Sequence, residues 1–517
     1  SFGATARRMN PQRRIFMNTT AQYVKAFINI CLSLYTVRLI LNILGQSDYG
    51  IYSLIASVVS MLGFITNAMV VTTQRYLSFY AGKGTKEDVR VIFSNSLILH
   101  VCIGLCLTLV LLSLKNFLCY GFFNISEARK PTAEIVYIMS TMMLFITFLA
   151  APFKAMLIAH ENIVYISIIE ILDGVLKLTL ALSLLTLGHD KLLLYACVMT
   201  IIFLFEFFAF SIYSVINFPE CQILSTFHDF DKNKIKELFG FAGWTTYGMC
   251  SIVGRTQGLA VLFNKFFGTV INAAYGLALQ VNGSVTFIAT SLINAMNPQL
   301  MQAEGSNDRK KMIHLAEQES KFSSAIIFVI LIPLAVEMDC VLNLWLVNVP
   351  PFTSFFCRSL ILAFIFDQLT YGLNSANQAL GNIKYYTLIM YTPKLLIIPL
   401  ALIMLWVGIQ VAWVMFLYIV VEFSVAMTRL FYMKKVIGLS IKQFSKNVFL
   451  RLLPLCSASF IVPLIIRFSF NGEYRFIFNL AISFLLGLLV MWHITLTKGE
   501  RNVVLDTLYK LKERVGK

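Results

Sequence analysis

Long apolar runs, separated by short polar connections, constrain the fold of this chain more than any other feature of its sequence. Hydrophobic residues make up 58% of its 517 residues and charged residues only 13%. A helix of about twenty apolar residues is long enough to cross the hydrocarbon core of a bilayer, and the connections between runs are of about that length or shorter. The sequence therefore predicts an all-α integral membrane protein without room for a separate soluble catalytic domain.

The apolar runs predict about fourteen transmembrane helices. Their expected limits are 16–44, 49–79, 88–113, 132–159, 163–188, 191–216, 236–264, 268–299, 320–344, 355–381, 385–408, 410–433, 448–469 and 475–497. Basic residues concentrate at alternate connections, such as Lys83, Lys86 and Arg90 and later Lys434 and Lys435. Because cytoplasmic connections are enriched in lysine and arginine, this bias predicts N-in and C-in termini. It also accounts for the net charge of +16 without a nucleic-acid partner.

Three short sequence matches indicate that the chain contains two related halves. The matching pairs are Thr19-Thr20 with Thr245-Thr246, Tyr49-Gly50 with Tyr275-Gly276, and Asn162-Ile163-Val164-Tyr165 with Asn382-Ile383-Lys384-Tyr385. The first two pairs are 226 residues apart and the third 220. Six predicted spans precede the polar linker and six follow it, so both halves begin on the same side of the membrane. The halves are therefore predicted to be parallel six-helix repeats, followed by two additional C-terminal helices.

This division predicts seven segments. They are a basic N-terminus at 1–15, an N-lobe at 16–216, a cytoplasmic linker at 217–235, a C-lobe at 236–433, an interfacial amphipathic segment at 434–447, two helices at 448–497 and a basic cytoplasmic tail at 498–517. In the interfacial segment, Ile437, Ile441, Phe444 and Val448 share one helical face, and lysines lie elsewhere. That pattern predicts contact with anionic membrane lipids. A short solvated helix is the alternative interpretation.

Polar side chains recur at steps of three or four on several predicted spans. The stripes are Asn18, Gln22, Lys25, Asn29, Ser33 and Thr36; Ser53, Ser57, Ser60, Asn67 and Gln74; Gly276, Gln280, Ser284, Ser291 and Asn294; and Asp367, Thr370, Asn374 and Gln378. Such spacing places side chains on one helical face, and polar residues within a span face the bundle interior or a hydrated cavity. The amides of Gln22, Asn29, Asn67, Gln280, Asn294 and Asn374 are therefore candidate substrate-cavity residues. For the serines, close helix packing is the alternative explanation.

Three basic residues within predicted spans are candidates for binding an anion: Lys25, Arg38 and Arg255. Lys25 belongs to the first polar stripe, whereas Arg38 lies on another face of the same helix, where its side chain can also extend to the outer interface. Arg255 has no acidic residue within one turn along the sequence. A buried arginine in that position requires a partner from another helix or an anionic ligand. The planar guanidinium suits phosphate because it donates in a bidentate way.

Acidic residues within the spans are candidates for coupling transport to an ion. Asp173 and Lys177 are spaced i,i+4, which predicts an ion pair within one helix. The alternative is a carboxylate whose pairing changes with proton or sodium binding, a role for which Glu170 and Asp367 are further candidates, with Lys177 as the exchanging partner. No CxxC motif and no cysteine–histidine cluster with metal-ligand spacing occurs, so neither a metal nor another cofactor is expected.

Several segments resemble one known family. VRLILNILGQSDYGIYSLI (37–55), IAHENIVYISIIEILDGVLKL (158–178), FAGWTTYG (241–248), TQGLAVLFNKFFGTVINAAYGLALQVNGSV (256–285) and AMNPQL (295–300) are similar to the bacterial Wzx-type oligosaccharide flippases of the MATE-like MOP superfamily. The resemblance implies two six-helix lobes around a V-shaped cavity. It also implies translocation of an undecaprenyl-diphosphate-linked repeat unit of O-antigen (lipopolysaccharide), capsule or exopolysaccharide across the cell inner membrane, driven by alternating access.

The resemblance also implies particular partners and site residues. Lys25, Arg38 and Arg255 would meet the diphosphate, while some members of the family carry an arginine where this chain has Tyr275. A proton or sodium gradient would reset the transporter, and a polysaccharide polymerase or assembly complex would act beside it. The protein would not be an enzyme. The alternatives are an ion-coupled multidrug or metabolite antiporter of the same fold, which would have an acid-rich cavity; a lipid II flippase; and a membrane polymerase, which the short connections disfavour.

Overall fold

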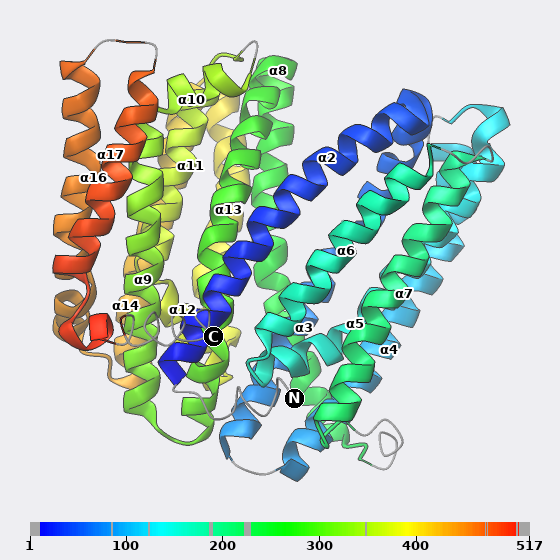
Figure 1. The fold of residues 1–517 in the computed structure, drawn as a ribbon, viewed down its shortest axis with the longest axis horizontal. Helices are drawn as coiled ribbons and strands as arrows, with labels where there is room; N and C mark the ends of the chain where they lie inside the picture. The colour runs from blue at the N-terminus through cyan, green and yellow to red at the C-terminus, as the bar shows by residue number, and fades with distance from the viewer. Residues whose placement is uncertain are drawn as a thin grey trace, which may run out of the picture. The chain divides into compact units, whose positions relative to one another are not determined.

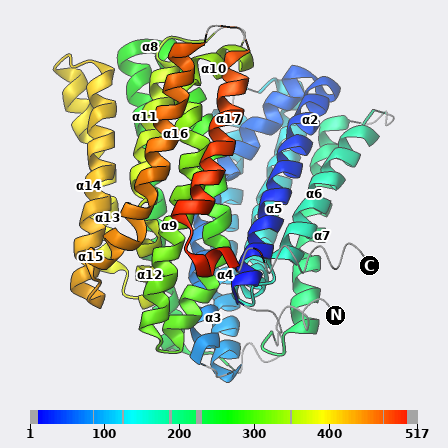
Figure 2. The ribbon, with the colours of Figure 1, turned by 60° about the vertical axis from the view of Figure 1, so that its left-hand side comes forward.

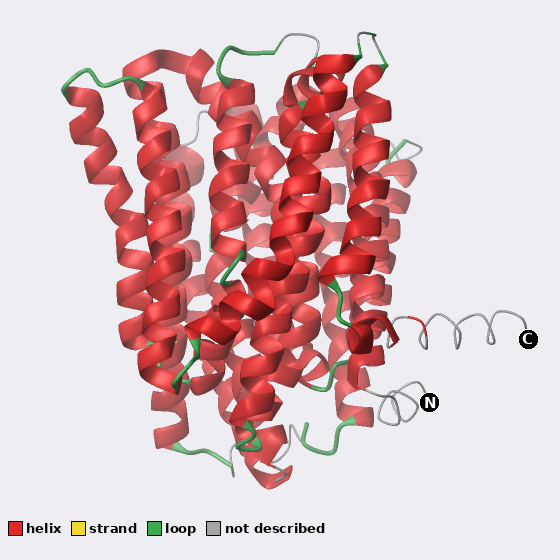
Figure 3. Ribbon diagram, turned by 90° about the vertical axis from the view of Figure 1, so that its left-hand side faces the viewer, coloured by secondary structure: helices red, strands yellow, loops and turns green. Residues whose placement is uncertain are grey.

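The regular structure of the described chain is entirely helical. The computed structural model describes residues 11–60, 62–83, 86–122, 125–185, 190–221, 229–346, 349–470, 472, 474–502 and 505. Within these ranges no strand occurs, and helices fill nearly the whole of the ribbon (Figure 3). The all-α fold predicted from the apolar runs is confirmed.

The helices fall into two compact units: Met17–Thr246 form the first, and residues 11–16 with the chain from Tyr247 onward form the second (Figure 1). The first unit contains α2 (Pro11–Ser60) from Met17 onward, α3 (Gly63–Lys83), α4 (Lys86–Asn116), η1 (Phe117–Phe122), η2 (Glu127–Arg129), α5 (Lys130–Ala159), α6 (Ile163–Ser183) and α7 (Lys191–Asn217). The helix α8 (Lys232–Gly305) carries the chain from the first unit into the second. The second unit continues with α9 (Arg309–Val336), α10 (Met338–Trp345), α11 (Thr353–Gln368), α12 (Tyr371–Leu380), α13 (Lys384–Trp406), α14 (Val411–Ile437), α15 (Ile441–Phe444), η4 (Ser445–Phe449), α16 (Leu450–Ser469), α17 (Arg475–Val490) and η5 (Met491–Thr495).

Many of these helices have the length and composition of membrane spans. Among the described residues, nine helices pass both criteria, and the bent pair α11–α12 raises the number to ten. The other four predicted spans lie on α2, α3, α6 and the first arm of α8. One of them, the span predicted at 163–188, contains Glu170, Asp173 and Lys177. A multi-pass membrane protein is therefore supported, while the count of fourteen spans stays a prediction.

One helix breaks where two spans were predicted, one predicted span is interrupted, and one helix continues where a turn was expected. Within α8, Gly268 has φ 82° and ψ −173°, a conformation that only glycine adopts readily, so the two arms match the spans predicted at 236–264 and 268–299. The pair α11–α12 is interrupted at 369–370 with a bend of 48°. In contrast, α2 stays helical through the connection predicted between residues 44 and 49, and α3 begins only at Gly63. Residues 45–50 include Gly45 and Gly50 but no proline, and a glycine disfavours a helix without stopping it.

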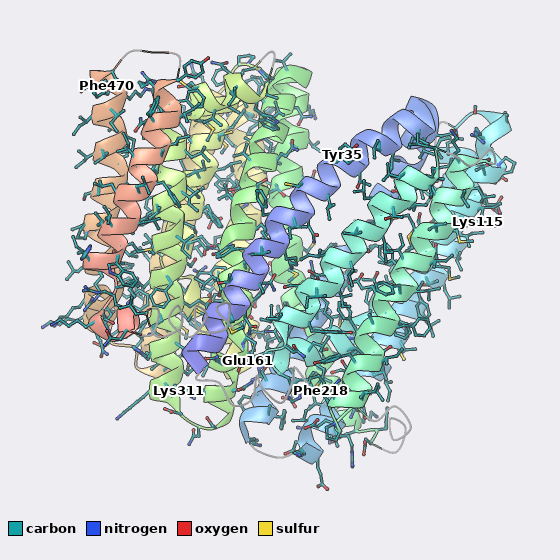
Figure 4. The ribbon with its side chains drawn as sticks, viewed as in Figure 1. Tyr35, Lys115, Glu161, Phe218, Lys311 and Phe470 are labelled. Atoms are coloured by element: carbon teal, nitrogen blue, oxygen red, sulfur yellow. The ribbon has the colours of Figure 1, made fainter. Side chains whose placement is uncertain are left out.

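In the first unit, α5 is the central helix and packs against α3, α4 and α7. Gly104 on α4 permits this packing, because a Cβ atom there would lie 2.9 Å from the Cβ atom of Phe148 on α5. The ring centroids of Phe93 and Phe153 are 5.4 Å apart in an edge-to-face arrangement. Figure 4 shows Lys115 and Phe218 at opposite ends of this unit, as the predicted alternation of connections requires.

In the second unit, α9 occupies the centre and packs against α11, α12, α16 and α17 (Figure 2). The rings of Phe263, Tyr275 and Phe356 form a buried cluster with centroids 5.0–5.5 Å apart. The two C-terminal helices are fixed to the unit at one end, where Arg475 Nη2 lies 3.0 Å from Glu337 Oε2 and Asn479 Nδ2 donates to Glu337 Oε1 at 2.6 Å. They therefore pack as part of the second unit, although the predicted repeat does not include them.

In the predicted interfacial segment, part of the apolar face packs against protein, whereas the sequence pattern predicted that this face contacts lipid. Phe444 and Val448 are buried in the core of the second unit. Lys434, Lys435 and Lys446 are exposed. Part of the apolar face is therefore covered by protein, while the exposed lysines remain available to lipid headgroups.

Candidate functional site

The first unit contains a buried carboxylate shared by two lysines. Lys25 Nζ on α2 lies 2.6 Å from Glu170 Oε2 on α6, and Lys154 Nζ on α5 lies 2.7 Å from Glu170 Oε1. The side chains of Lys25 and Glu170 are 11% and 20% exposed. The close approach of α2 to α6 makes this contact possible, since a Cβ atom on Gly174 would lie 3.0 Å from Leu32 Cδ1.

The predicted pair of Asp173 and Lys177 is present, with 2.7 Å between Lys177 Nζ and Asp173 Oδ2. It lies one turn from Glu170 on the same helix, and Glu206 on α7 lies within electrostatic range of both acids. The sequence pattern indicated functional roles for Lys25, Glu170, Asp173 and Lys177, and Lys154 was missed. The signal was available, because Lys154 lies in an otherwise apolar span.

The second unit holds a larger network of five charged side chains. They are Arg255 on α8, Asp367 on α11, Lys394 on α13, and Glu422 and Arg429 on α14. All five are largely buried, with side chains 4–16% exposed. The Lys394 ammonium links the two acids, at 2.8 Å from Glu422 Oε2 and 3.4 Å from Asp367 Oδ1.

Arg255 has the interhelical partner that its sequence position required. Its Nη1 atom pairs with Glu422 Oε1, and its guanidinium lies 4.1 Å from the ring centroid of Tyr418, a cation–π geometry. The Nε atom of Arg255 has no hydrogen-bond partner among the described atoms. Glu422 is therefore the partner from another helix that a buried Arg255 requires. The Nε–H group of Arg255 remains available as a donor.

Arg429, which sequence analysis did not single out, stabilises the break between α11 and α12. Its Nη1 atom donates to the backbone carbonyl of Asp367 at 3.0 Å and to Thr370 Oγ1 at 3.1 Å. Its Nη2 atom donates to Asp367 Oδ1 at 2.8 Å. The last carbonyls of a helix lack partners within that helix, so a guanidinium at this position supplies the missing donors. The predicted stripe at 367–378 thus lies on a broken span, where backbone groups become available to a site.

The two networks lie on corresponding helices of the two halves. The sequence repeat relates α2 to the first arm of α8, α5 to the α11–α12 pair, α6 to α13 and α7 to α14. Their charged residues do not occupy equivalent positions: at the repeat offset of 220, Lys154 corresponds to Asn374 and Glu170 to Met390. The predicted repeat therefore does not extend to the charges.

The other predicted site residues differ in their exposure. Gln22 and Asn374 are buried at 7% and 2% exposure, Asn29 is half-buried, and Asn67, Gln280 and Asn294 are exposed. On the second arm of α8, exposed positions recur at Gly276, Gln280, Ser284 and Asn294, while Ser291 is buried. This pattern gives the α8 arm one exposed polar face. The side chain of Arg38 lies outside the described residues, and Tyr275 is buried in the aromatic cluster.

Comparison with known proteins identifies the fold. No protein-family model matches the chain, and no curated protein sequence matches it. A crystal structure of a MATE mutant is similar with TM-score 0.72 and 14% identity, covering 85% of this chain and 98% of that one. A MOP superfamily transporter from Pyrococcus furiosus, described by a reverse polarity of its binding pocket that suggests a different function, has TM-score 0.71 and 12% identity over 85% and 98% of the two chains. A multidrug resistance MATE family transporter of the MOP superfamily, in an outward-facing conformation, has TM-score 0.70 and 12% identity, covering 85% of this chain and 98% of that one.

Proposed function

We propose that this MATE-like transporter is a lipid-linked oligosaccharide flippase. It moves an undecaprenyl-diphosphate-linked polysaccharide repeat unit across the bacterial inner membrane by alternating access, with both termini in the cytoplasm. The similarity to solved MATE and MOP transporters supports a role in membrane transport. The sequence resemblance to the Wzx-type flippases supports the narrower substrate class, and with it a polysaccharide polymerase or assembly complex as a partner.

The observation that carries the proposal is the excess of cations in the buried network of the second unit. Three basic side chains, Arg255, Lys394 and Arg429, share two carboxylates, Asp367 and Glu422. A low-dielectric environment strengthens the attraction of an uncompensated positive charge for an anion. A diphosphate suits this network because arginine donates to phosphate through a planar fork. The exposed amides Asn67, Gln280 and Asn294 would contact sugar hydroxyls.

In this mechanism the ion network exchanges partners during transport. When a diphosphate binds Arg255, Glu422 keeps only Lys394 as its ion-pair partner. Lys394 then interacts less strongly with Asp367. The carboxylate that loses a cation becomes a site for a proton or a sodium ion. Glu170, with Asp173 and Lys177 beside it, would serve the same purpose in the first unit. Lys25 and Arg38 would meet the diphosphate there.

An ion-coupled multidrug or metabolite antiporter is the second candidate, because one solved structure of this fold is a multidrug resistance transporter. Such a protein would use acidic groups to bind cations, whereas basic groups outnumber acidic ones in the second-unit network. The Pyrococcus furiosus transporter, described by the reverse polarity of its binding pocket, supports the idea that this fold can accommodate a change of charge. A lipid II flippase would use the same diphosphate chemistry with a different glycan.

The test uses purified full-length protein in liposomes that contain a fluorescent undecaprenyl-diphosphate-linked oligosaccharide. Flipping is measured as loss of glycan access to an external lectin. Arg255→Gln is expected to slow flipping at least about tenfold, the effect of losing about 1.4 kcal/mol of transition-state stabilisation. The matched control is Arg255→Gln/Glu422→Gln, which also removes the carboxylate that loses its arginine partner. If this double variant flips the lipid at the wild-type rate, Arg255 has only a structural role.

A parallel assay separates the two candidate functions. The same liposomes are loaded with a cationic dye and given a proton or sodium gradient. Gradient-driven dye export without glycan flipping would favour the antiporter. Flipping of the diphosphate-linked glycan, competed by other undecaprenyl-diphosphate lipids but not by the dye, supports the flippase.

A further inference from the structure

One buried carboxyl of the second unit lies outside the ion network and has no role in the mechanism above. Glu319, on α9, is fully buried. Its Oε1 atom accepts a hydrogen bond from Ser375 Oγ on α12 at 2.6 Å. Among the described atoms, its Oε2 atom has no hydrogen-bond partner. Glu319 therefore receives one neutral donor in a site without access to water.

The charged groups around Glu319 are engaged elsewhere. On α9 itself, Glu317 accepts a hydrogen bond from Asn447 and Lys321 pairs with Glu500. On α12, the titratable neighbour is the phenol Tyr371, which is neutral. The charged groups on the other elements packed against α9 are Asp367 (with Lys394 and Arg429), Asp339 (with Arg358 and Arg467), Arg475 (with Glu337), the exposed Lys446, and Arg451, which lines a cavity beside Lys321. Among the described residues, no lysine or arginine pairs with Glu319.

The contact between α9 and α12 at this point is unusually close. A Cβ atom on Gly372 would lie 2.0 Å from the carbonyl oxygen of Ala316, and the Gly372 amide donates to Ser320 Oγ at 3.0 Å. Ser323 Oγ donates to Gln368 Oε1 at 2.6 Å across the neighbouring α9–α11 contact. These contacts lie beside the break at 369–370, so the Glu319 carboxyl is buried next to the one interruption of this span.

We propose that Glu319 is a proton-binding site, occupied in this conformation, whose proton holds α12 against α9. The neutral acid fits the site because burying a carboxylate with no counter-charge is strongly unfavourable. On deprotonation, the proton leaves Oε2 for water and the electron pair of the O–H bond stays on the carboxylate. That charge has only the Ser375 hydroxyl to stabilise it, so α12 moves from α9 until water reaches the group. The inference does not depend on which substrate the protein transports.

Infrared difference spectroscopy tests the proton directly, without any transport assay. The purified full-length protein at neutral pH is expected to show the carbonyl-stretch band of a protonated carboxylic acid, shifted on exchange into D₂O. Glu319→Gln should lose one carboxyl equivalent of that band, because glutamine is a neutral isostere of the acid. Glu317→Gln, two residues away on the same helix, is the matched control and should keep it. An unchanged band in Glu319→Gln, or its absence from the wild type, would overturn the proposal.

Two further measurements test the same proton through other residues and other signals. Ser375→Ala removes the donor to the carbonyl oxygen, so the band should move to higher frequency; an unmoved band contradicts the assignment. Hydrogen–deuterium exchange of residues 371–380 then tests the consequence. Raising the pH should reduce protection of this segment more in the wild type than in Glu319→Gln. An identical response in the two proteins would show that the proton does not control the α9–α12 contact.

Discussion

The Lys394 ammonium lies 2.8 Å from Glu422 Oε2, on the same carboxylate whose other oxygen pairs with Arg255. Glu422 thereby joins α8 and α13 through α14, and Lys394 extends the chain of charges to Asp367 at 3.4 Å. A network of this kind has more than one favourable pairing, because each carboxylate can keep one cation when it loses another. That property would suit the transport role proposed above, which requires the protein to pass between conformations.

Removing Arg255 should destabilise the second unit mainly by leaving Glu422 under-compensated. Breaking one partner of a buried pair typically costs about 3–5 kcal/mol, and the remaining Lys394 should keep the loss near the lower end. Arg255→Gln should therefore lower the thermal unfolding midpoint in detergent more than Arg255→Gln/Glu422→Gln does. Equal losses in the two variants would mean that the stranded carboxylate is not the cause.

Because Lys25 and Lys154 share the Glu170 carboxylate, we expect their substitutions to have non-additive effects on the stability of the first unit. Lys25→Gln and Lys154→Gln each leave the carboxylate with one ammonium, whereas the double variant leaves it with none. The double variant should therefore lose more stability than the sum of the singles, with a coupling energy of about 0.5–3 kcal/mol. Adding Glu170→Gln to the double variant should recover part of the loss. Additive effects in a thermal unfolding cycle would contradict the shared-carboxylate arrangement.

Gly372 should not tolerate a side chain. A methyl group there meets the backbone carbonyl of Ala316 at 2.0 Å, which no rotamer change can relieve, so α12 must move away from α9. Overpacking of this kind costs typically about 1–3 kcal/mol or more. Gly283→Ala on α8 is the control, because nothing lies within 4 Å of its Cβ position. Thermal unfolding should show a loss for Gly372→Ala and none for Gly283→Ala, and equal midpoints would refute the close contact.

The segment after η5 should be held against α9 in a pH-dependent way. Lys321 Nζ lies 2.6 Å from Glu500 Oε1, and both residues line a polar cavity of about 220 Å³. Burial raises the pKa of Glu500, but the Lys321 ammonium and the hydrogen bonds from Lys321 and Thr497 outweigh it, so the pKa lies below its usual value. A lowered pKa means that the contact is complete above the ordinary pKa of glutamate, about 4.3, and is lost as the pH falls through the lower folded-state value.

Glu500→Gln should reproduce the acid state at neutral pH. Hydrogen–deuterium exchange of residues 497–502 should be faster in this variant than in the wild type, and it should become less sensitive to acidification. The control is Glu317→Gln, which changes another carboxylate of the same cavity without removing the Lys321 partner. Equal exchange in Glu500→Gln and the wild type would show that the Lys321 pair does not hold this segment.

The sequence by itself determined the features that depend on neighbouring residues along the chain. Apolar length required membrane-spanning helices, Gly268 allowed the kink in α8, and the i,i+4 spacing of Asp173 and Lys177 produced their ion pair. Each follows from helical geometry, which fixes the relation between residues a few positions apart. The broken span at 369–370 was not predicted, because its stability depends on a guanidinium from another helix.

Only the tertiary structure decided which charges meet. Arg255 and Glu422 are 167 residues apart in sequence, and Lys25 and Glu170 are 145 apart. Helical periodicity indicates the face on which a side chain lies, but not the depth or register at which a neighbouring helix presents its partner. Packing sets that register, and it placed Glu422 beside Arg255 while leaving Glu319 buried without a cation. The same kinds of residue thus became an ion network in one place and an isolated carboxyl in another.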